Sequence, residues 1–476
     1  MEAGGAPPNA DRRSDWWVFT HDRGLVEDGV VSGDRVERGP GFWRRWAKDL
    51  DRARDRLDNN AIRLGIEWSR VFPRSTSGVR TGAKVSRKEL RRLDDLADRA
   101  AVRRYGRILR GARERGLRVM LTLNHFTLPV WVHDPLAVRR AFDGVGPDED
   151  VPSGLKRAGW LNRSTVAELR KFAAYAAWKF GRHVRLWATV NEPLVTVSQG
   201  FVSIPAVTGT KAPAILNFAA ALRAVETISL ANAAAYDAIH AHDRRARVGF
   251  VVNLLDWRPS DPAKPEDATA AAHADQIYNR SFMDAAVDGW YDTDADGVRD
   301  AGEVHEDRRG KADFVGVNHY SPAYAAKTDP VTPRIPLFDF VPQIAFRGTA
   351  NPAGPECPTT CTEFGWEIDP AGLASVVREA ASYGKPVYVT ENGIDDADDD
   401  DRPEYLRGYL RALHGAIAAG ADVRGYFHWS LLDNFEWAEG FDAHFGLFDF
   451  DPKTLRRTMR PSGKLFAKAA RTNAVP

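Results

Sequence analysis

Apolar runs of strand length alternate with helix-periodic segments along almost the whole chain, and this alternation restricts the fold more than any other feature of the sequence. The strand-like runs lie at residues 61–68, 118–126, 186–191, 248–255, 314–320, 387–391 and 425–431. Helical periodicity is clearest over residues 90–112, 166–180 and 369–384. Strands that alternate with helices predict a parallel sheet covered by helices, and no repeat or linker divides the chain. We therefore expect a single α/β domain over residues 1–476.

The order of the first elements bears on how such a sheet closes. A helix-like segment at 42–57 precedes the first clear strand, whereas a (β/α)8 barrel needs a strand ahead of that helix. Residues 1–14 form an irregular N-terminal segment of glycine, proline and charge, and Trp16 to Phe19 is apolar but short. The expected architecture is a (β/α)8 TIM barrel that lacks its first strand in this chain. Either the barrel is open on one side, or the true start lies upstream and Met1 is an internal methionine.

The composition narrows the class of ligand. The chain has 66 basic and 65 acidic residues, so its net charge of +1 gives no overall attraction for nucleic acid or an anionic membrane. No uncharged run has the length of a membrane span, and the N-terminus lacks the features of a secretion signal. These observations predict a cytoplasmic protein with no nucleic-acid partner and no membrane partner, and they allow a small neutral substrate.

Polar side chains gather where the predicted strands end, which is where reactive groups lie in an α/β barrel. Two of them are glutamates, Glu192 and Glu391, and a charge at the rim of an apolar core is costly unless it is used. The other strand-end residues are Arg63, Trp68, Asn124, His125, Asn191, Asn318, Tyr320, Trp429, Glu436 and Trp437. Two carboxyl groups among amides and indoles suit hydrolysis of a glycosidic bond, in which one carboxyl donates a proton and the other attacks. The alternative is that both glutamates form ordinary surface ion pairs.

Motifs spread over nearly the whole chain resemble those of glycoside hydrolase family 1, the retaining β-glycosidases, and most closely its archaeal-type β-galactosidase/β-glucosidase branch. They are Arg63 to Arg70, Asn124 to Phe126 with Leu128-Pro129, Thr189 to Pro193, Asn318 to Tyr320, Val389 to Gly393 and His428 to Trp437. The family implies a (β/α)8 barrel that hydrolyses β-glycosides and requires no cofactor. No phosphate loop, metal triad or serine elbow in the sequence points elsewhere.

Position by position, the resemblance implies that Glu391 is the nucleophile and Glu192 the acid/base of a retaining mechanism. It places Arg63 and Tyr320 against Glu391, as the cation and the hydrogen-bond donor that keep it ionised, and it assigns Asn191 to the 2-hydroxyl of the sugar. Glu192 then faces a fixed negative charge in a partly dry cavity, which raises its pKa and lets it donate a proton near neutral pH. Because the covalent intermediate can also be attacked by a sugar or an alcohol, transglycosylation is an expected side activity.

Further residues are implied to bind the non-reducing sugar. The resemblance assigns hydroxyl contacts to His125, Glu436 and Trp437, stacking to Trp429, and a place in the substrate site to Asn318. Residue type alone favours core packing for the histidine and the tryptophans, and the motifs reverse that preference. Glu436 would repel a phosphate group, so we expect an unphosphorylated β-D-glucosyl or β-D-galactosyl unit at the end of a small or oligomeric β-glycoside. The sequence does not rank glucose against galactose, fucose or mannose, and a homo-oligomer is allowed.

The resemblance is incomplete at the N-terminus. The family begins with a strand and then a glutamine that binds the 3- and 4-hydroxyls, and neither is present here, in agreement with the strand count. A misplaced start codon would explain this, and the chain as given should then bind its sugar more weakly and leave strand edges unpaired. Two other classes stay open. An inactive carbohydrate-binding relative or fragment is disfavoured by the intact Glu192 and Glu391, and a phospho-β-glycosidase is disfavoured by Glu436.

Residues 292–303 have the spacing of a calcium loop, with a glycine at the sixth position. The candidate ligands are Asp292, Asp294, Asp296, Asp300 and Glu303. Such an ion would be structural and not catalytic. The alternative is an acidic surface loop.

Two smaller features remain. Cys357 and Cys361 are compatible with a small loop disulfide or with two free thiols, and a cytoplasmic setting favours thiols. The acidic run at residues 395–401 is interpreted as a solvated charged loop.

Overall fold

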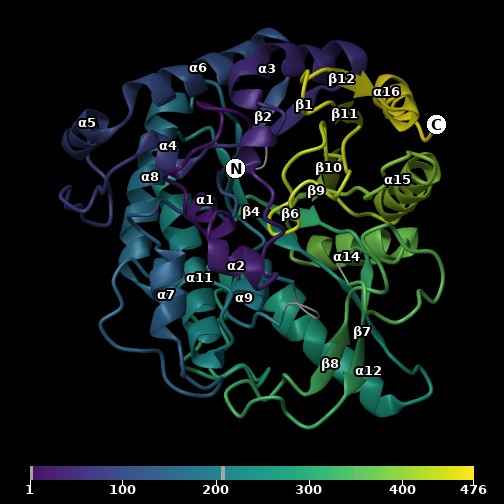
Figure 1. The fold of residues 1–476 in the computed structure, drawn as a ribbon. Coiled ribbons are helices and arrows are strands. Elements are labelled where there is room, and N and C mark those ends of the chain that lie inside the picture. The colour runs from purple at the N-terminus through teal and green to yellow at the C-terminus, as the bar shows by residue number, and fades with distance from the viewer. Residues whose placement is uncertain (1–3, 205–208, 350) are drawn as a thin grey trace.

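Seven parallel strands form the centre of the computed structural model, which describes residues 4–204, 209–349 and 351–476. In their order across the sheet they are β1 (Ala61–Gly65), β2 (Arg118–Asn124), β3 (Leu186–Asn191), β4 (Arg247–Asn253), β6 (Phe314–Asn318), β9 (Val387–Glu391) and β10 (Val423–Tyr426). Helices surround the curled sheet (Figure 1). The main ones are α3 (Phe42–Asp51), α6 (Arg99–Glu114), α8 (Ser164–Phe180), α11 (Phe218–His242), α14 (Pro370–Ser382) and α15 (Arg402–Ala418).

Burial on both faces explains why the strands appear as nearly continuous apolar runs. All five residues of β6 and six of the seven residues of β2 are buried, as expected for parallel strands that helices cover. Several helices begin where a side chain accepts a hydrogen bond from one of their first free N–H groups: Asp98 before α6, Asn217 before α11 and Asp369 before α14. The core lies between the strands and this ring of helices, and it includes the fully buried Phe172 and Trp187.

The sheet has two edges. Among the described residues, β1 pairs only with β2 and β10 pairs only with β9. A cavity of about 800 Å³ is lined by both edge strands, with Ile62 on one side and Val423 on the other. The prediction of a barrel with seven strands and one open position is therefore confirmed. Trp16 to Phe19 do not form a strand, because they belong to helix α1 (Asp15–Thr20), where Trp16 packs edge-on against Trp437 at 4.7 Å between ring centroids.

A small second sheet consists of β5 (Asp256–Pro259), β7 (Pro322–Lys327) and β8 (Phe340–Gln343). Helix α12 (Pro265–Asp275) packs on it through alanines and Phe340, and β7, β8 and α12 lie together in Figure 1. Because β5 and β7 follow directly after β4 and β6, this small sheet stands at the carboxyl ends of the barrel strands. It therefore lies on the side where barrel enzymes place their sites.

The remaining elements are short or peripheral. They are α2 (Arg23–Glu27), η1 (Val36–Arg38), η2 (Arg52–Arg56), α4 (Trp68–Val71), α5 (Arg87–Leu96), α7 (Pro135–Ala141), η3 (Gly159–Leu161), α9 (Pro193–Gly200), η4 (Gln276–Arg280), α13 (Ser281–Met283), η5 (Asp284–Asp288), β11 (Phe448–Phe450), β12 (Arg457–Met459) and α16 (Pro461–Thr472). Within the described ranges, no helix combines the length and the apolar character needed to cross a membrane.

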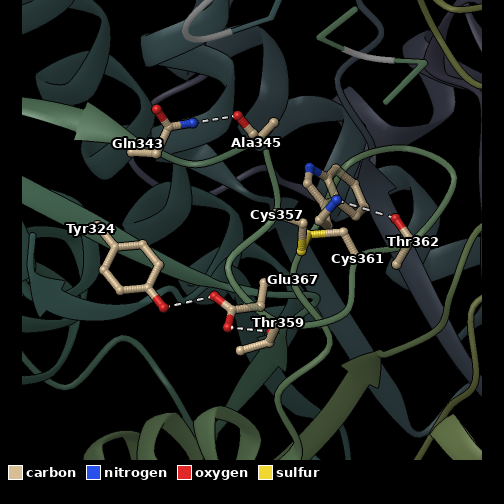
Figure 2. Close-up of a disulfide and its surroundings, with 9 residues drawn as sticks. Tyr324, Gln343, Ala345, Cys357, Thr359, Cys361, Thr362 and Glu367 are labelled. Carbon is tan, nitrogen blue, oxygen red and sulfur yellow. Dashed lines mark hydrogen bonds between the residues drawn. A yellow bond between two sulfur atoms is a disulfide. The ribbon is translucent and has the colours of Figure 1, made fainter. Parts of the chain in front are cut away.

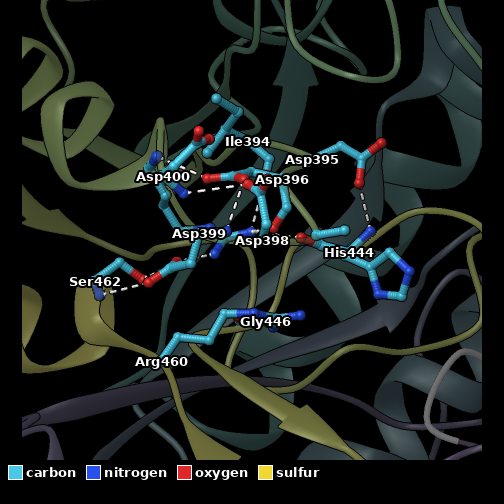
Figure 3. A network of polar contacts seen from close by, with 12 residues as sticks. Ile394, Asp395, Asp396, Asp398, Asp399, Asp400, His444, Gly446, Arg460 and Ser462 are labelled. Atoms are coloured by element: carbon cyan, nitrogen blue, oxygen red, sulfur yellow. Dashed lines mark hydrogen bonds and ion pairs between the residues drawn. The ribbon is translucent and has the colours of Figure 1, made fainter.

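The acidic run after β9 is not the solvated loop that its charge predicts (Figure 3). Three of its aspartates are buried. Asp396 accepts hydrogen bonds from the backbone N–H groups of Asp399, at 2.9 Å, and Arg402, at 2.8 Å. Asp399 pairs with the Arg402 guanidinium and accepts from the backbone N–H of Ser462 at 2.8 Å. The prediction is wrong because these carboxylates tie the loop after Glu391 to α15 and α16.

Cys357 and Cys361 form a disulfide with an S–S distance of 2.07 Å (Figure 2). Of the two states that the sequence left open, the structure therefore has the oxidised one, and the preference for thiols is wrong. Next to the disulfide, the Glu367 carboxylate accepts hydrogen bonds from the Tyr324 hydroxyl at 2.7 Å and the Thr359 hydroxyl at 2.8 Å. These contacts fix the disulfide loop against β7.

Two carboxyl groups meet in a half-buried position between α12 and α14. The Asn279 side-chain amide donates to Asp275 Oδ1 at 2.6 Å and to Glu379 Oε2 at 3.3 Å, and Arg280 Nη1 lies 3.6 Å from Glu379 Oε1. Burial, with the Asp275 charge as the second cause, raises the pKa of Glu379 to about 8. The pair therefore holds a proton at neutral pH.

We expect Glu379→Gln to stabilise the protein at alkaline pH. The unfolded chain releases the Glu379 proton near pH 4.5 and the folded chain near pH 8, so the stability that this group contributes is complete below the first value and is lost as the pH rises towards the second. Glutamine has no charge to bury. Urea denaturation should give the variant a higher free energy of unfolding than wild type at about pH 9 and a similar one at about pH 5. The control is Glu114→Gln, which changes a side chain that is 66% exposed, and an equal gain at both pH values would contradict the prediction.

Candidate functional site

The carboxyl ends of the strands bring the two predicted glutamates to one place. Glu391 is the last residue of β9, and its Cα pairs in register with that of Asn318, the last residue of β6. Glu192 follows β3, and its backbone N–H donates to the carbonyl of Val251 in β4 at 2.7 Å. At this point the chain turns sharply into α9, and Glu192 has a φ of 46°, in the left-handed region. The turn directs the chain from the strand end into the helix.

Glu391 is surrounded by residues that lie in, or directly after, three other strands. The Arg63 guanidinium, in β1, donates to Oε1, and the Tyr320 hydroxyl donates to Oε2 at 2.7 Å. His125 Nε2 lies 3.9 Å from Oε1. The Glu391 residue is only 3% exposed. A buried carboxylate with a cation and a phenol donor has the partners that a negative charge needs in such a place.

Glu192 has a different environment. Its Oε1 accepts a hydrogen bond from Asn318 Nδ2 at 2.6 Å. Burial, with the charge of Glu391 as the second cause, raises the pKa of Glu192 to about 8. At neutral pH this carboxyl therefore carries a proton.

A short chain of polar contacts connects the two carboxyl groups. Asn318 Nδ2 lies 3.3 Å from Asn191 Oδ1, and Asn191 Oδ1 accepts from Arg63 Nη2 at 2.5 Å. Arg63 in turn pairs with Glu391, so the link runs from Glu192 through Asn318, Asn191 and Arg63 to Glu391. Thr390 Oγ1 donates to the Asn318 side chain at 2.7 Å and fixes the orientation of its amide. The link thus joins a protonated carboxyl group to a carboxylate that is paired with Arg63.

Four of the residues predicted to bind sugar, His125, Trp429, Glu436 and Trp437, line one cavity of about 810 Å³ together with Glu192 and Glu391. Asn191 and Asn318 are not among the residues that line it. The rings of Trp429 and Trp437 lie 5.9 and 5.6 Å from the ring of His125, between centroids. Glu436 also lines the cavity, close to Trp437 in sequence. Burial, with the Arg63 charge as the second cause, holds the pKa of His125 well below its usual range, so the imidazole is neutral. Indole faces, an imidazole and a carboxylate in one cavity can bind the faces and hydroxyls of a sugar ring.

Two further residues of this cavity carry no sequence signal. Lys211 is only 6% exposed, and its ammonium lies 3.7 Å from the centroid of the Phe126 ring and 4.8 Å from that of Trp437. Its positive charge opposes the rise in the pKa of Glu192. Tyr278, in η4, donates its hydroxyl to Asn253 at the end of β4 at 2.9 Å. Neither residue lies in a strand-end motif, because both are supplied by segments between the strands.

The predicted calcium loop is only partly assembled. Asp292, Asp294 and Glu303 each offer a carboxylate oxygen within 4.8 Å of the others. Asp296 and Asp300 lie outside that group. The loop is stabilised by backbone donors, with Gly297 N–H at 2.8 Å from Asp292 and Thr293 N–H at 2.6 Å from Glu303. Calcium binding here stays a prediction.

We expect millimolar calcium to raise the melting temperature of the wild-type protein, because an ion would screen carboxylates that lie close together. The Glu303→Gln variant should lose that response. Glu306→Gln is the matched control, since it changes a side chain that is 74% exposed three residues further on. Differential scanning calorimetry with and without a chelator measures the effect, and an equal response of all three proteins would count against a site.

Comparison of the sequence and the fold with those of known proteins identifies the family of this chain. The model of glycosyl hydrolase family 1 matches residues 149–475. A beta-galactosidase of Sulfolobus acidocaldarius is 36% identical over 485 residues, covering 99% of this chain and 92% of that protein. The crystal structure of the beta-glycosidase from the hyperthermophile Thermosphaera aggregans superimposes with a TM-score of 0.87 at 34% identity, covering 99% of this chain and 94% of that one.

A further solved structure is a beta-glucosidase mutant derived from a hyperthermophilic tetrameric structure. It superimposes with a TM-score of 0.84 at 32% identity and covers all of this chain and 93% of that one. The similarity in sequence and in structure extends over nearly the full length of each relative. The chain is therefore a glycoside hydrolase with a (β/α)8 barrel fold, and it belongs to glycosyl hydrolase family 1.

Proposed function

We propose that the protein is a retaining exo-β-glycosidase, with Glu391 as the nucleophile and Glu192 as the acid/base. The observation that carries the proposal is the contrast between two buried carboxyl groups. One pairs with Arg63, and burial raises the pKa of the other to about 8. A retaining mechanism needs one ionised and one protonated carboxyl on opposite sides of the scissile bond.

The reaction then has two steps. Glu391 attacks the anomeric carbon while Glu192 gives its proton to the departing oxygen, and the glycosidic bond breaks as the ester to Glu391 forms. Formation of the ester removes the negative charge of Glu391, which had raised the pKa of Glu192. The pKa of Glu192 therefore falls, and its carboxyl group stays ionised. It takes a proton from water, which attacks the anomeric carbon and releases the sugar and Glu391. An alcohol or a second sugar in place of water gives transglycosylation.

The substrate in this proposal is a terminal, unphosphorylated β-D-glucosyl or β-D-galactosyl unit of a β-glycoside. The relatives named beta-galactosidase and beta-glucosidase support both sugars. The neutral His125 and the carboxylate of Glu436 would bind hydroxyls, and Trp429 would stack against the ring. Asn191, which accepts a hydrogen bond from Arg63, would contact the 2-hydroxyl. Glu436 would disfavour a phosphate group.

We further propose that residues 1–476 act as one barrel domain and assemble as a homo-oligomer. Support for one domain is the continuous sheet from β1 to β10, which draws strands from most of the chain. A homo-oligomer is supported by a related beta-glucosidase mutant, which was derived from a tetrameric structure.

The stereochemistry of the first product tests the mechanism. We expect the chain to hydrolyse 4-nitrophenyl β-D-glucoside and β-D-galactoside, and proton NMR should show the β-anomer of the free sugar before mutarotation produces the α-anomer. If the α-anomer formed first, the mechanism would be inverting and the proposed retaining mechanism would be wrong. Absence of turnover on all β-glycosides would overturn the proposed activity.

A further inference from the structure

Residues 357–368, between β8 and α14, contain a short antiparallel hairpin, and we refer to them as the disulfide hairpin. One arm of the hairpin holds the disulfide between Cys357 and Cys361 (Figure 2). Cys361 pairs with Glu367 on the other arm in an antiparallel bridge. The disulfide is therefore attached directly to the arm that carries Trp366, which precedes Glu367 in the chain.

The Trp366 ring packs against a residue that bonds the proposed nucleophile. Its centroid lies 5.1 Å from that of Tyr320, whose hydroxyl donates to Glu391 Oε2 at 2.7 Å. Phe364 lies 4.6 Å from Trp366, and Phe445 lies 6.1 Å from Tyr320, both between ring centroids. Because a hydrogen bond is directional, the hydroxyl reaches the carboxylate only while the phenol ring keeps its orientation. These ring contacts therefore hold the donor in place.

Glu367 links the disulfide to Trp366. Its carboxylate is buried and accepts hydrogen bonds from the Tyr324 hydroxyl in β7 at 2.7 Å and from the Thr359 hydroxyl at 2.8 Å (Figure 2). Thr359 lies inside the short loop that the disulfide closes, so the covalent bond keeps this donor beside the carboxylate. When the bond is broken, the loop gains conformational freedom and the buried carboxylate has one fixed donor fewer, which costs free energy. The positions of Glu367 and of the adjoining Trp366 then vary more.

A reductant can reach the disulfide. Both cysteines are half-buried, and the three residues between them, 358–360, are exposed. A dithiol reduces such a bond in two exchanges: one thiolate attacks a sulfur and breaks the S–S bond, and the second thiol then displaces the mixed disulfide. Cys357 and Cys361 end as thiols, and the dithiol ends as a disulfide, so two electrons and two protons pass from the reductant to the protein.

We infer that the Cys357–Cys361 disulfide controls the activity of the site: the oxidised form positions Tyr320 against Glu391, and reduction by a dithiol slows the attack by Glu391. The inference rests on the proposed function, because it assumes that Glu391 is the nucleophile. Trp366 is a positioning residue in this scheme, since it acts through Tyr320. A carboxylate that loses a fixed donor spends less time in the orientation from which it attacks, and small displacements of reacting atoms have large effects on rate.

β-D-Glucosyl fluoride tests the attack without a large leaving group. Its fluoride is too small to contact Trp366, so its kcat/KM reports on the formation of the glycosyl-enzyme and not on contacts with an aglycone. We expect kcat/KM of the folded wild-type protein to fall about fivefold after reduction with dithiothreitol, the effect of one weakened hydrogen bond. Removal of dithiothreitol and reoxidation should restore it. A loss on 4-nitrophenyl β-D-glucoside alone would overturn the inference, because the hairpin would then act on the leaving group.

Variants identify the path from the disulfide to the nucleophile. Cys357→Ser combined with Cys361→Ser should have the kcat/KM of the reduced wild-type protein and should not respond to dithiothreitol, which controls for other effects of the reductant. If this variant does not fold, the reduced and reoxidised wild-type protein still gives the comparison. Tyr320→Phe lacks the hydroxyl that donates to Glu391, so reduction should lower its remaining activity no further. A fivefold loss in Tyr320→Phe as well would contradict the path through Tyr320.

A purely structural disulfide gives a different result. Reduction would then lower the temperature of unfolding but leave kcat/KM for the fluoride unchanged well below that temperature, and this outcome would overturn the inference. Failure of the oxidised wild-type protein on the fluoride would refute the catalytic proposal instead. Turnover of the fluoride at equal rates in the oxidised and reduced forms would refute only the role of the disulfide.

Discussion

Replacement of Glu391 by glycine is expected to lower kcat on aryl β-glucosides by at least about 10⁴-fold. The change removes the atom that attacks the anomeric carbon, and with it the partner of the Arg63 guanidinium and of the Tyr320 hydroxyl. The loss should appear in kcat and not only in KM, because the covalent bond forms in the chemical step. Initial rates with 4-nitrophenyl β-D-glucoside measure it.

Azide turns this loss into a positive test of the role of Glu391. The glycine variant leaves a space beside Arg63, whose positive charge favours a small anion there. We expect azide to restore turnover of an activated aryl glucoside and to give α-glucosyl azide, since the anion attacks from the side that Glu391 occupied. Wild-type protein with azide is the control and should give free glucose with retained configuration. Wild-type activity in Glu391→Gly, or β-glucosyl azide as its product, would contradict the assignment.

The topology explains why much of this site could be predicted from sequence. Arg63, Asn191, Asn318 and Glu391 each lie in or at the end of a barrel strand, and parallel strands bring their carboxyl ends to one side of the sheet. Hydrophobic runs locate such strands in a sequence. The mutual contacts of these residues then follow from the strand order.

Other features depend on contacts that a local pattern does not contain. By composition alone, Trp16 to Phe19 could be a short strand or one turn of helix. In the structure they belong to a helix, and Trp16 packs against Trp437, a contact that the local sequence does not reveal. The acidic run at 395–401 has the composition of a solvated loop, and its partner Ser462 lies about sixty residues away in α16. Lys211 comes from a segment between strands, where periodicity gives no information on which side chains face the cavity.

The second large effect is expected for Glu192→Ala, and it should depend on the leaving group. Without the proton donor, kcat/KM for a substrate with a poor leaving group, such as hexyl β-D-glucoside, should fall by about 10² to 10⁴-fold. A 2,4-dinitrophenyl glucoside departs without protonation, so its rate of glycosyl-enzyme formation should change little. Stopped-flow measurement of the burst of dinitrophenol tests this directly. A similar loss on both substrates would contradict the role of Glu192 as the acid.

The pH dependence gives an independent test of the same residue. Because the pKa of Glu192 is raised to about 8, the reactive protonated form is present below that value and disappears above it, so kcat/KM of the wild-type protein should fall on the alkaline side. On the dinitrophenyl substrate this alkaline limb should be absent from wild type and from Glu192→Ala alike, since no proton is needed. Lys211→Met should move the limb of the otherwise intact protein to higher pH, because the Lys211 charge opposes the rise in the pKa of Glu192. A limb that stays in place in Glu192→Ala would mean that another group titrates there.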